Sequence, residues 1–300
     1  MSPIQIACAV LVPLLWGVQY VVIKMGLAVF PPLFFVGLRF AAVSIILIPF
    51  VGFPTKRELG LFMLISVFIG GLNFGLVFVG LAHGLASVTG VANQLWTPFT
   101  LLLAWPLLGE RPSMRVIMGV VIAFCGVVLT VVDPDVPVPV VPTILVVGSG
   151  LALATGTVLT KRYGPFEPMK LMAWMSLFTV PQVLGASAML ERGQIASLAA
   201  ASFESWLAFT YTVFLGGIAG FSLWFWLIAR CAVSRVAPFA LLQTGFAVAA
   251  AVILLREQLT PALVAGAVIC VAGVLVTQWR SIASQGEPSA APAPAGKAGS

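Results

Sequence analysis

Ten nearly unbroken apolar runs, each about 20 residues long, divide the chain. A helix of about 20 residues spans the hydrocarbon core of a bilayer, whereas the strands of a membrane barrel alternate polar and apolar residues over about ten positions. The pattern therefore predicts an all-α membrane protein with ten transmembrane helices. The expected spans are 4–23, 32–50, 59–81, 87–108, 114–132, 143–160, 168–189, 205–227, 236–255 and 261–279.

The scarcity of charge excludes most other protein classes. Only 8% of the 300 residues are charged and 61% are hydrophobic, although about 25% of the residues of a soluble domain are charged. A soluble enzyme, a nucleic-acid-binding domain and a disordered protein are therefore excluded. The net charge of +6 comes from Lys and Arg scattered through short connections, which form no patch for nucleic acid. The four cysteines lack the spacing of metal ligands, and we expect neither a metal nor another cofactor.

The distribution of basic residues predicts the orientation in the membrane. Cytoplasmic connections of membrane proteins are enriched in Lys and Arg. With a cytoplasmic amino terminus, the opposite side carries only Lys24, Arg192 and Arg256, and Arg39 lies inside the second span. We therefore expect both termini to be cytoplasmic in a multi-pass protein of the cell inner membrane. The basic residues on the expected cytoplasmic side are Lys56, Arg57, Arg111, Arg115, Lys161, Arg162, Lys170, Arg230, Arg235, Arg280 and Lys297.

The two ends of the chain differ in character. The first ten residues have neither a basic segment nor a small-residue cleavage pattern, so we expect a retained first span rather than a removed signal peptide. Residues 280–300 are rich in Ala, Pro, Gly and Ser and contain little that could be buried. We expect them to form a disordered cytoplasmic tail.

The chain contains an internal repeat. At an offset of 147 residues, 82–130 match 229–277 without a gap, and the earlier parts align at an offset of about 137. The expected units are a first five-helix repeat (1–132), a connecting loop (133–142) and a second repeat (143–279). Because five is an odd number of spans, the second repeat enters the membrane from the opposite side, which is the architecture that permits alternating access. The alternative is that the duplication only stabilises a bundle. The aligned residues include Lys24 with Lys161, Ser87 with Ser234, Thr97 with Thr244, Glu110 with Glu257, Gly119 with Gly266 and Gly126 with Gly273.

Two segments carry a resemblance to a known family. LLGERPSMRVIMGVVIAFCGVVLTV and its copy LLREQLTPALVAGAVICVAGVLVTQW each have an acidic residue at a helix end and two glycines seven residues apart in the next span. They resemble the paired signature of the drug/metabolite transporter (DMT) superfamily, EamA type, and within it the YddG-type amino-acid exporters. The second half departs by carrying Leu153 and Ala154 where Trp16 and Gly17 stand. The resemblance implies a ten-helix exporter of small metabolites, with a cavity framed mainly by spans 3, 4, 8 and 9.

The few polar residues inside the spans are the candidates for substrate binding, because polar groups at membrane depth are costly unless they are buried against protein or line a cavity. The repeat aligns Trp96 and Thr97 with Gln243 and Thr244, so these positions are expected to meet across one central site. Hydrogen bonding between helices explains such residues equally well. The expected cavity-lining residues are Asn73, Asn93, Gln94, Trp96, Thr97, Tyr211, Gln243 and Thr244.

Three charged residues stand apart. Arg39 is the one clear charge inside a span, where it could attract a substrate carboxylate, cap helix carbonyls or extend towards the headgroups. Glu110 and Glu257 precede the fifth and tenth spans, and their position indicates a structural role in which each ties a short turn to neighbouring backbone donors.

The near absence of charge inside the spans limits the substrate. A phosphate or nucleotide-sugar carrier needs several basic residues around its cavity, and proton-coupled antiport usually needs a carboxylate within a span. We therefore expect facilitated efflux of amino acids, aromatic or otherwise apolar and zwitterionic, together with related small metabolites. The lipid bilayer and the amino-acid substrate are the expected partners, and a monomer is expected to be sufficient. The alternatives are an exporter of drugs or other neutral metabolites and a non-transporting structural membrane protein.

Overall fold

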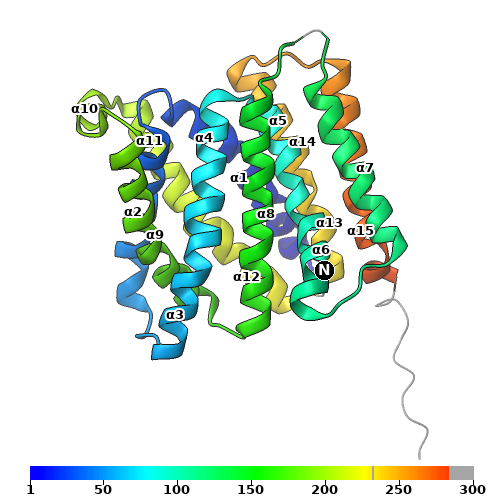
Figure 1. Cartoon of the computed structure of the whole chain (residues 1–300), viewed down its shortest axis with the longest axis horizontal. Coiled ribbons are helices and arrows are strands. Elements are labelled where there is room, and N and C mark those ends of the chain that lie inside the picture. The colour runs from blue at the N-terminus through cyan, green and yellow to red at the C-terminus, as the bar shows by residue number, and fades with distance from the viewer. Residues whose placement is uncertain (135, 232, 284–300) are drawn as a thin grey trace, which may run out of the picture.

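The computed structural model describes residues 1–134, 136–231 and 233–283, which form helices and connections without any strand. Figure 1 shows the helices side by side in one bundle, with the α7–α8 connection at one end and the start of α3 at the other. The elements are α1 (Pro3–Gly26), α2 (Pro32–Leu47), η1 (Ile48–Phe50), α3 (Lys56–Ile65), η2 (Ser66–Phe74), α4 (Gly75–His83), α5 (Ala86–Ala92), η3 (Asn93–Leu95), α6 (Trp96–Leu108), α7 (Met114–Val131), α8 (Val140–Tyr163), α9 (Pro168–Leu190), α10 (Gln194–Ala200), α11 (Phe203–Thr210), η4 (Tyr211–Ala219), α12 (Gly220–Arg230), α13 (Val233–Ala240), α14 (Leu242–Leu255) and α15 (Pro261–Ala283).

Local sequence signals explain where several helices begin. Ser2 and Thr55 accept hydrogen bonds from the backbone of residues three positions later, and the side chains of Gln5 and Glu58 bond back to them. Such reciprocal capping satisfies backbone donors that have no partner within the helix. Pro32 opens α2, where the missing N–H costs nothing because the first turn has no acceptor for it.

The number of uninterrupted spans is smaller than predicted. Nine helices in the described part of the chain are long and apolar enough to cross a membrane. The predicted span 87–108 is instead three consecutive pieces, α5, η3 and α6. Pro98 explains the interruption, because it has no N–H for the carbonyl of Gln94 and its ring crowds that carbonyl. The equivalent span of the second repeat has a turn at Leu241, between α13 and α14, although Pro238–Leu255 is still one of the nine.

Two further differences concern the connections. The short helix α10 lies in the loop between the predicted seventh and eighth spans, where no helix was expected. The last helix, α15, continues to Ala283, three residues beyond the predicted start of the tail at 280. The rest of the predicted tail, 284–300, lies outside the described residues.

The two halves of the chain meet in antiparallel fashion at α7 and α15. A Cβ atom on Gly126 would lie 2.6 Å from the carbonyl oxygen of Gly266, and one on Gly273 would lie 2.7 Å from that of Gly119. Gly119 therefore faces Gly273 while Gly126 faces Gly266. Because the repeat aligns Gly119 with Gly266 and Gly126 with Gly273, each contact is the image of the other under a twofold rotation, as expected for inverted repeats.

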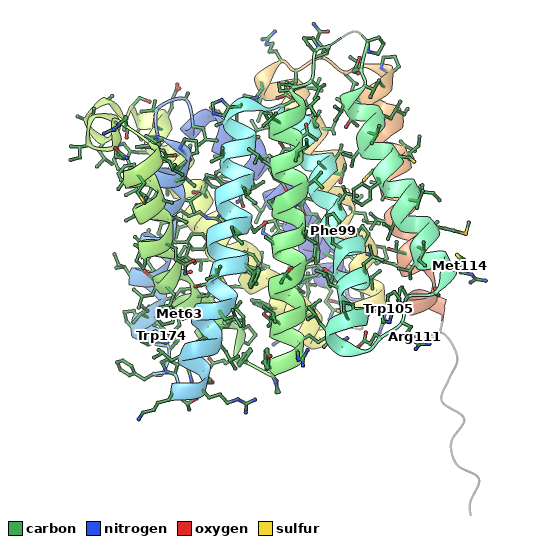
Figure 2. The ribbon with its side chains drawn as sticks, viewed as in Figure 1. Met63, Phe99, Trp105, Arg111, Met114 and Trp174 are labelled. Atoms are coloured by element: carbon green, nitrogen blue, oxygen red, sulfur yellow. The ribbon has the colours of Figure 1, made fainter. Side chains whose placement is uncertain are left out.

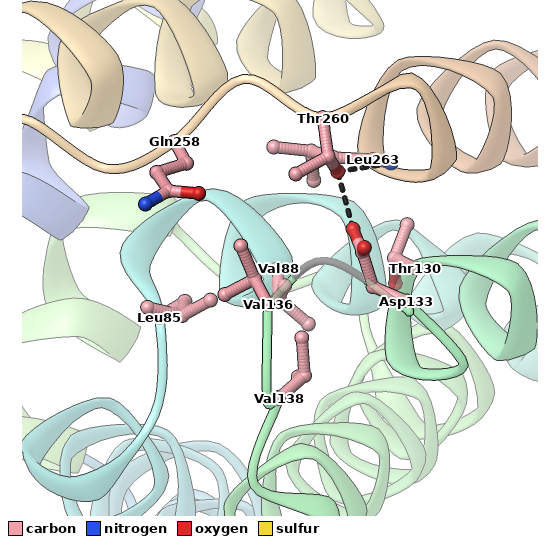
Figure 3. Close-up of a pocket in the computed structure, with 9 residues that line it drawn as sticks. All are labelled: Leu85, Val88, Thr130, Asp133, Val136, Val138, Gln258, Thr260 and Leu263. Atoms are coloured by element: carbon pink, nitrogen blue, oxygen red, sulfur yellow. Dashed lines mark hydrogen bonds between the residues drawn. The ribbon is translucent and has the colours of Figure 1, made fainter.

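The connection between the repeats is fastened to the second one. Figure 3 shows Asp133, which follows α7, accepting a hydrogen bond from the hydroxyl of Thr260. The same hydroxyl oxygen accepts a bond from the backbone N–H of Leu263 in the first turn of α15, at 3.1 Å. The end of α7 and the start of α15 are thereby held together at one end of the bundle.

The outside of the bundle is apolar, as a lipid environment requires. Met63, Trp105 and Met114 are 59%, 53% and 70% exposed, and Figure 2 shows them on α3, α6 and α7. Exposed apolar surface of this extent marks a membrane-facing protein. Trp174, also labelled in Figure 2, is buried and donates a hydrogen bond to the carbonyl of Gly52 at 3.2 Å.

Candidate functional site

The interrupted spans of the two repeats meet through polar side chains. The amide nitrogen of Gln94 in η3 donates to the hydroxyl of Thr244 in α14 at 2.7 Å, and both side chains are buried. Gln243, which precedes Thr244 in α14, donates to the hydroxyl of Tyr20 in α1 at 3.2 Å. Three elements that are distant in sequence therefore share a polar contact region inside the bundle. Both amides have partners on other elements, so hydrogen bonding between helices accounts for these contacts in this conformation.

The other predicted cavity residues lie in η2, in η4 and at the junction of η3 and α6. The amide nitrogen of Asn73 in η2 donates to the carbonyl of Ile69 one turn earlier, at 3.3 Å, and the residue is buried. The hydroxyl of Tyr211, the first residue of η4, donates to the carbonyl of Leu15 in α1 at 3.0 Å. The residues at the junction of η3 and α6 are half-buried, namely Asn93, Trp96 and Thr97.

Two π-helices, η2 and η4, are repeat-related features that the sequence analysis did not identify. Each is nine residues long and lies in the middle of a long span, between α3 and α4 in the first half and between α11 and α12 in the second. Residues 67–71 (VFIGG) and 213–217 (VFLGG) are nearly identical. Sliding the chain against itself at an offset of 146 would have revealed this match. π-Helical segments within α-helices are rare and occur frequently at functional sites.

The glycine pairs of the π-helices allow polar side chains to approach the backbone. A Cβ atom on Gly71 would lie 2.8 Å from the amide oxygen of Gln182 in α9. In the second half, Gly216 is packed against the amide of Gln19 in α1, and its carbonyl accepts a hydrogen bond from the indole of Trp16 at 3.1 Å. Any larger side chain at these glycines would displace the facing polar residue.

Arg39 lies between the two π-helices. Its guanidinium carbon is 4.5 Å from the ring centroid of Phe74, the last residue of η2, and 5.6 Å from that of Phe40. On the other side, a Cβ atom on Gly217 of η4 would lie 3.9 Å from Nη2. The residue is 3% exposed, so it does not extend to the headgroups, and its Nε and Nη1 atoms have no hydrogen-bond partner among the described residues. Burying an unpaired charge costs several kcal/mol, of which contacts with aromatic rings return about 2 kcal/mol.

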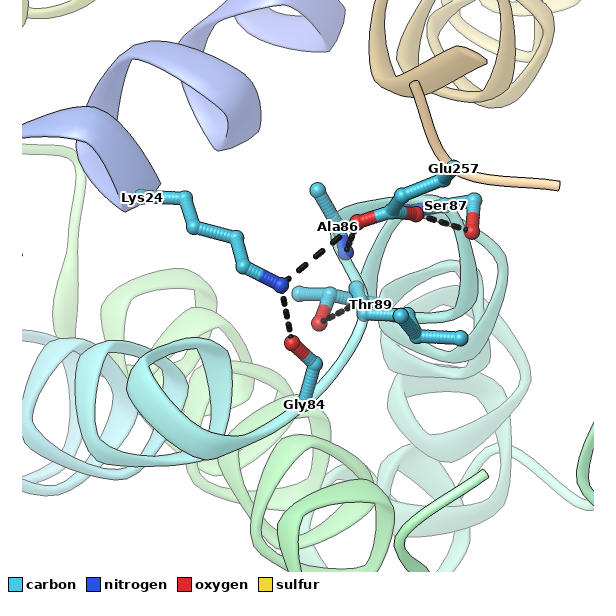
Figure 4. Close-up of polar contacts among 7 residues, drawn as sticks. Lys24, Gly84, Ala86, Ser87, Thr89 and Glu257 are labelled. Carbon is cyan, nitrogen blue, oxygen red and sulfur yellow. Dashed lines mark hydrogen bonds and ion pairs between the residues drawn. The ribbon is translucent and has the colours of Figure 1, made fainter. Parts of the chain in front are cut away.

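At one end of the bundle, Glu257 joins the two repeats (Figure 4). Its Oε1 atom accepts a hydrogen bond from the backbone N–H of Ala86 at 2.8 Å, and Oε2 accepts from the N–H and hydroxyl of Ser87 at 3.0 and 2.6 Å. Lys24 lies 3.5 Å from Oε1 and also donates to the carbonyl of Gly84. We call these bonds to the start of α5 the Glu257 cap, and this end of the bundle the Glu257 face.

Glu110 is the repeat counterpart of Glu257 and lies in a different environment. It forms an ion pair with Lys161 at 2.8 Å, and Lys161 is the counterpart of Lys24. The Glu110 side chain is 56% exposed, whereas that of Glu257 is 7% exposed. The repeat-related pairs therefore occupy unlike states, one buried against a helix start and one in contact with solvent. We call the end of the bundle that carries Glu110 the Glu110 face.

The backbone presents the two glutamates in the same way. Helix α6 ends at Gly109 with φ of 76°, and α14 ends at Arg256 with φ of 56°. The N–H groups of Glu110 and Glu257 then bond to carbonyls six residues earlier, at 3.3 and 3.2 Å. A left-handed residue directly after a helix turns the following N–H groups back onto the last carbonyls of that helix. Because the turns match, the difference between the glutamates arises from what faces them and not from the local backbone.

Comparison with known proteins identifies the family. The model of the EamA-like transporter family matches residues 3–132 and again residues 141–279. A protein of Escherichia coli strain K12 named "Probable amino-acid metabolite efflux pump" is 30% identical over 93% of this chain and 97% of its own length. A protein of the same name from Salmonella typhimurium is 30% identical over 89% of this chain and 92% of its own length.

Other comparisons agree. "Uncharacterized transporter YvbV" of Bacillus subtilis is 26% identical over 91% of this chain and 90% of its own length. One solved crystal structure superposes with a TM-score of 0.61 over 95% of this chain and 100% of its own, and its 16% sequence identity bears on the fold alone. The sequence resemblance to the EamA type is thereby confirmed, as is the membrane location. The matched family and the named relatives are transporters and not enzymes, as predicted. The chain belongs to the EamA-like transporter family and is a multi-pass membrane transporter.

Proposed function

We propose that the protein exports amino acids and related small metabolites across a bacterial inner membrane by alternating access. The preferred substrates are zwitterionic, with aromatic or other apolar side chains. The names of two relatives that are 30% identical support export of amino-acid metabolites. The absence of acidic residues from the middle of the spans supports a substrate that is neutral overall and facilitated efflux without obligatory proton exchange. Both termini and the Glu110 face are assigned to the cytoplasm from the distribution of Lys and Arg.

The observation that carries alternating access is the unlike state of the two repeat-related glutamates. Glu257 caps the start of α5, and at the repeat offset of 147 the corresponding target of Glu110 is the start of α13, at Val233 and Ser234. We infer that the described conformation is closed at the Glu257 face. In the opposite conformation, Glu257 releases α5 while Glu110 leaves Lys161 and caps α13. Inverted repeats make such an exchange possible, because each half can adopt the conformation of the other.

Transport itself is tested in proteoliposomes. Purified protein is reconstituted with labelled L-phenylalanine, and efflux is measured with and without a pH gradient. We expect protein-dependent efflux down the substrate gradient in both conditions. Strict dependence on the pH gradient would contradict the facilitated mechanism, and no flux of any amino acid would contradict the proposed substrate class.

The proposed central site consists of the cavity-lining residues predicted from the sequence, with Trp96 and Gln243 as its test positions. Trp96→Ala and Gln243→Ala are expected to impair efflux without loss of folded protein, because both residues are half-buried where the interrupted spans meet. Trp105→Ala and Gln258→Ala are matched controls, since both side chains are exposed. Wild-type rates in both Trp96→Ala and Gln243→Ala would remove this assignment.

A further inference from the structure

We propose that Arg39 binds the carboxylate of the exported amino acid, an inference that rests on the proposed function and specifies its anchoring residue. The guanidinium is buried between the two π-helices with two of its nitrogens unbonded among the described residues. Guanidinium groups bind carboxylates through two parallel hydrogen bonds, and the strength of these bonds increases when water is excluded. A substrate carboxylate would supply the acceptors that the described residues do not provide.

Within the part of the chain that the structure describes, Arg39 forms no ion pair. Its nine acidic residues lie at helix ends, in connections or in the tail, and the ion pairs of the described residues join Lys24, Lys161 and Lys170 to glutamates at those ends. The faces of Phe74 and Phe40 are the partners that the guanidinium has. Aromatic faces stabilise a cation but accept no directed hydrogen bond, so the forked N–H groups of the guanidinium remain available to bind a carboxylate.

The architecture does not require a charge at this position. At the repeat offset of 137 that aligns Lys24 with Lys161, the counterpart of Arg39 is Ser176 in α9. That hydroxyl is buried and donates to the carbonyl of Met172 in its own helix, at 2.6 Å. The second half thus builds the same span with a small, internally bonded residue. The arginine is a departure from the repeat, which favours a role in binding over a role in folding.

The surroundings of Arg39 suit the rest of an apolar amino acid. Because Gly217 has no side chain, η4 places no side-chain atom of that residue between its backbone and the guanidinium, and Phe74 and Phe40 provide apolar walls for a substrate side chain. Gln19 packs on the neighbouring Gly216 and carries an amide oxygen that can accept a hydrogen bond from the substrate ammonium group. The same place therefore offers complementary groups for each part of a zwitterion.

The test compares substrates with and without a carboxylate in the full-length protein. L-phenylalanine, L-phenylalaninamide and phenethylamine are used as competitors of labelled L-phenylalanine counterflow in proteoliposomes. The wild type should be inhibited by the free acid and at least about tenfold more weakly by the amide and the amine, because both lack the carboxylate. In Arg39→Gln the KM for L-phenylalanine should rise by about tenfold or more, and the preference for the acid over the amide should disappear. Arg39→Lys, which keeps the charge but not the fork, should be intermediate.

The controls separate binding from folding. Arg57→Gln, at an exposed position, should leave the KM and the preference unchanged. Without ligand, Arg39→Gln should melt at or above the wild-type temperature, because it removes a buried unpaired charge. L-phenylalanine should raise the melting temperature of the wild type and not that of Arg39→Gln.

Each outcome decides between the proposals. An unchanged KM and acid preference in folded Arg39→Gln would overturn the role of Arg39 while leaving amino-acid export intact. Equal inhibition of the wild type by acid and amide would also overturn it, even if Arg39→Gln did not fold. A folded wild-type protein that transports no amino acid would instead refute the proposed function.

Discussion

Replacing Glu257 by Gln should release the Glu257 cap and shift the protein towards the conformation open at that face. The carboxylate now accepts three hydrogen bonds from Ala86 and Ser87 and one longer contact from Lys24. A Gln amide keeps one acceptor oxygen, and its NH2 group would face the N–H of Ser87, donor against donor. Two charge-assisted bonds are therefore lost.

The magnitude follows from those two bonds. A hydrogen bond to a charged group contributes about 1.5–3 kcal/mol, and the hydroxyl of Ser87 can rotate to accept a bond from the new amide, which reduces the loss. A net change of about 3 kcal/mol is expected, equivalent to a roughly 150-fold change in the ratio of the two conformations. In the proposed exchange the bonds exist in one conformation only, so most of this energy should appear in the conformational equilibrium.

Labelling of a single cysteine measures the shift. Val88 in α5 is 3% exposed in the described conformation and follows the capped residue Ser87 directly. In a protein whose four native cysteines are replaced, Val88→Cys should react slowly with an impermeant maleimide added at the Glu257 face. Adding Glu257→Gln should accelerate the reaction by one to two orders of magnitude, and the melting temperature reports whether the variant remains folded.

The matched control is the same substitution in the other repeat. Glu110→Gln removes the cap proposed for the opposite conformation, so labelling of Val88→Cys should be slowed or unchanged. Labelling of Glu257→Gln at the wild-type rate, or acceleration by Glu110→Gln, would refute the exchange of caps between the repeats.

Two further predictions concern packing and helix ends. Gly126→Ala should cost about 1–3 kcal/mol of stability, because its Cβ would lie 2.6 Å from the carbonyl oxygen of Gly266. Gly245→Ala is the control and should not destabilise the protein, because its Cβ would meet nothing within 4 Å. Equal melting temperatures of the two variants in detergent would show that α7 and α15 are not closely packed. Gly109→Ala and Gly193→Ala, at φ of 76° and 79°, should each cost about 1 kcal/mol, but only Gly109→Ala should slow efflux, because Gly109 positions Glu110. Equal transport rates in these two variants would argue against a role for Glu110.

The sequence by itself determined the membrane-spanning helical fold, the repeat and the family. A bilayer imposes a length and an apolarity on each span, and both are readable along the chain without knowledge of any contact. The glycines of α7 and α15 were likewise visible as a repeat. The interruption of the 87–108 span was not predicted, although Pro98 signals it, because proline is common in membrane helices and often only bends them.

Only the tertiary structure decided what the polar residues contact. Gln94 and Thr244 are 150 positions apart, and no periodicity predicts that they bond to each other. The sequence likewise aligned Glu110 with Glu257, but it could not show that one is buried and the other exposed. A repeat encodes two equivalent halves, whereas the described conformation places the two glutamates in unlike environments. That asymmetry arises from packing between segments distant along the chain, and so does the position of Arg39 between the two π-helices.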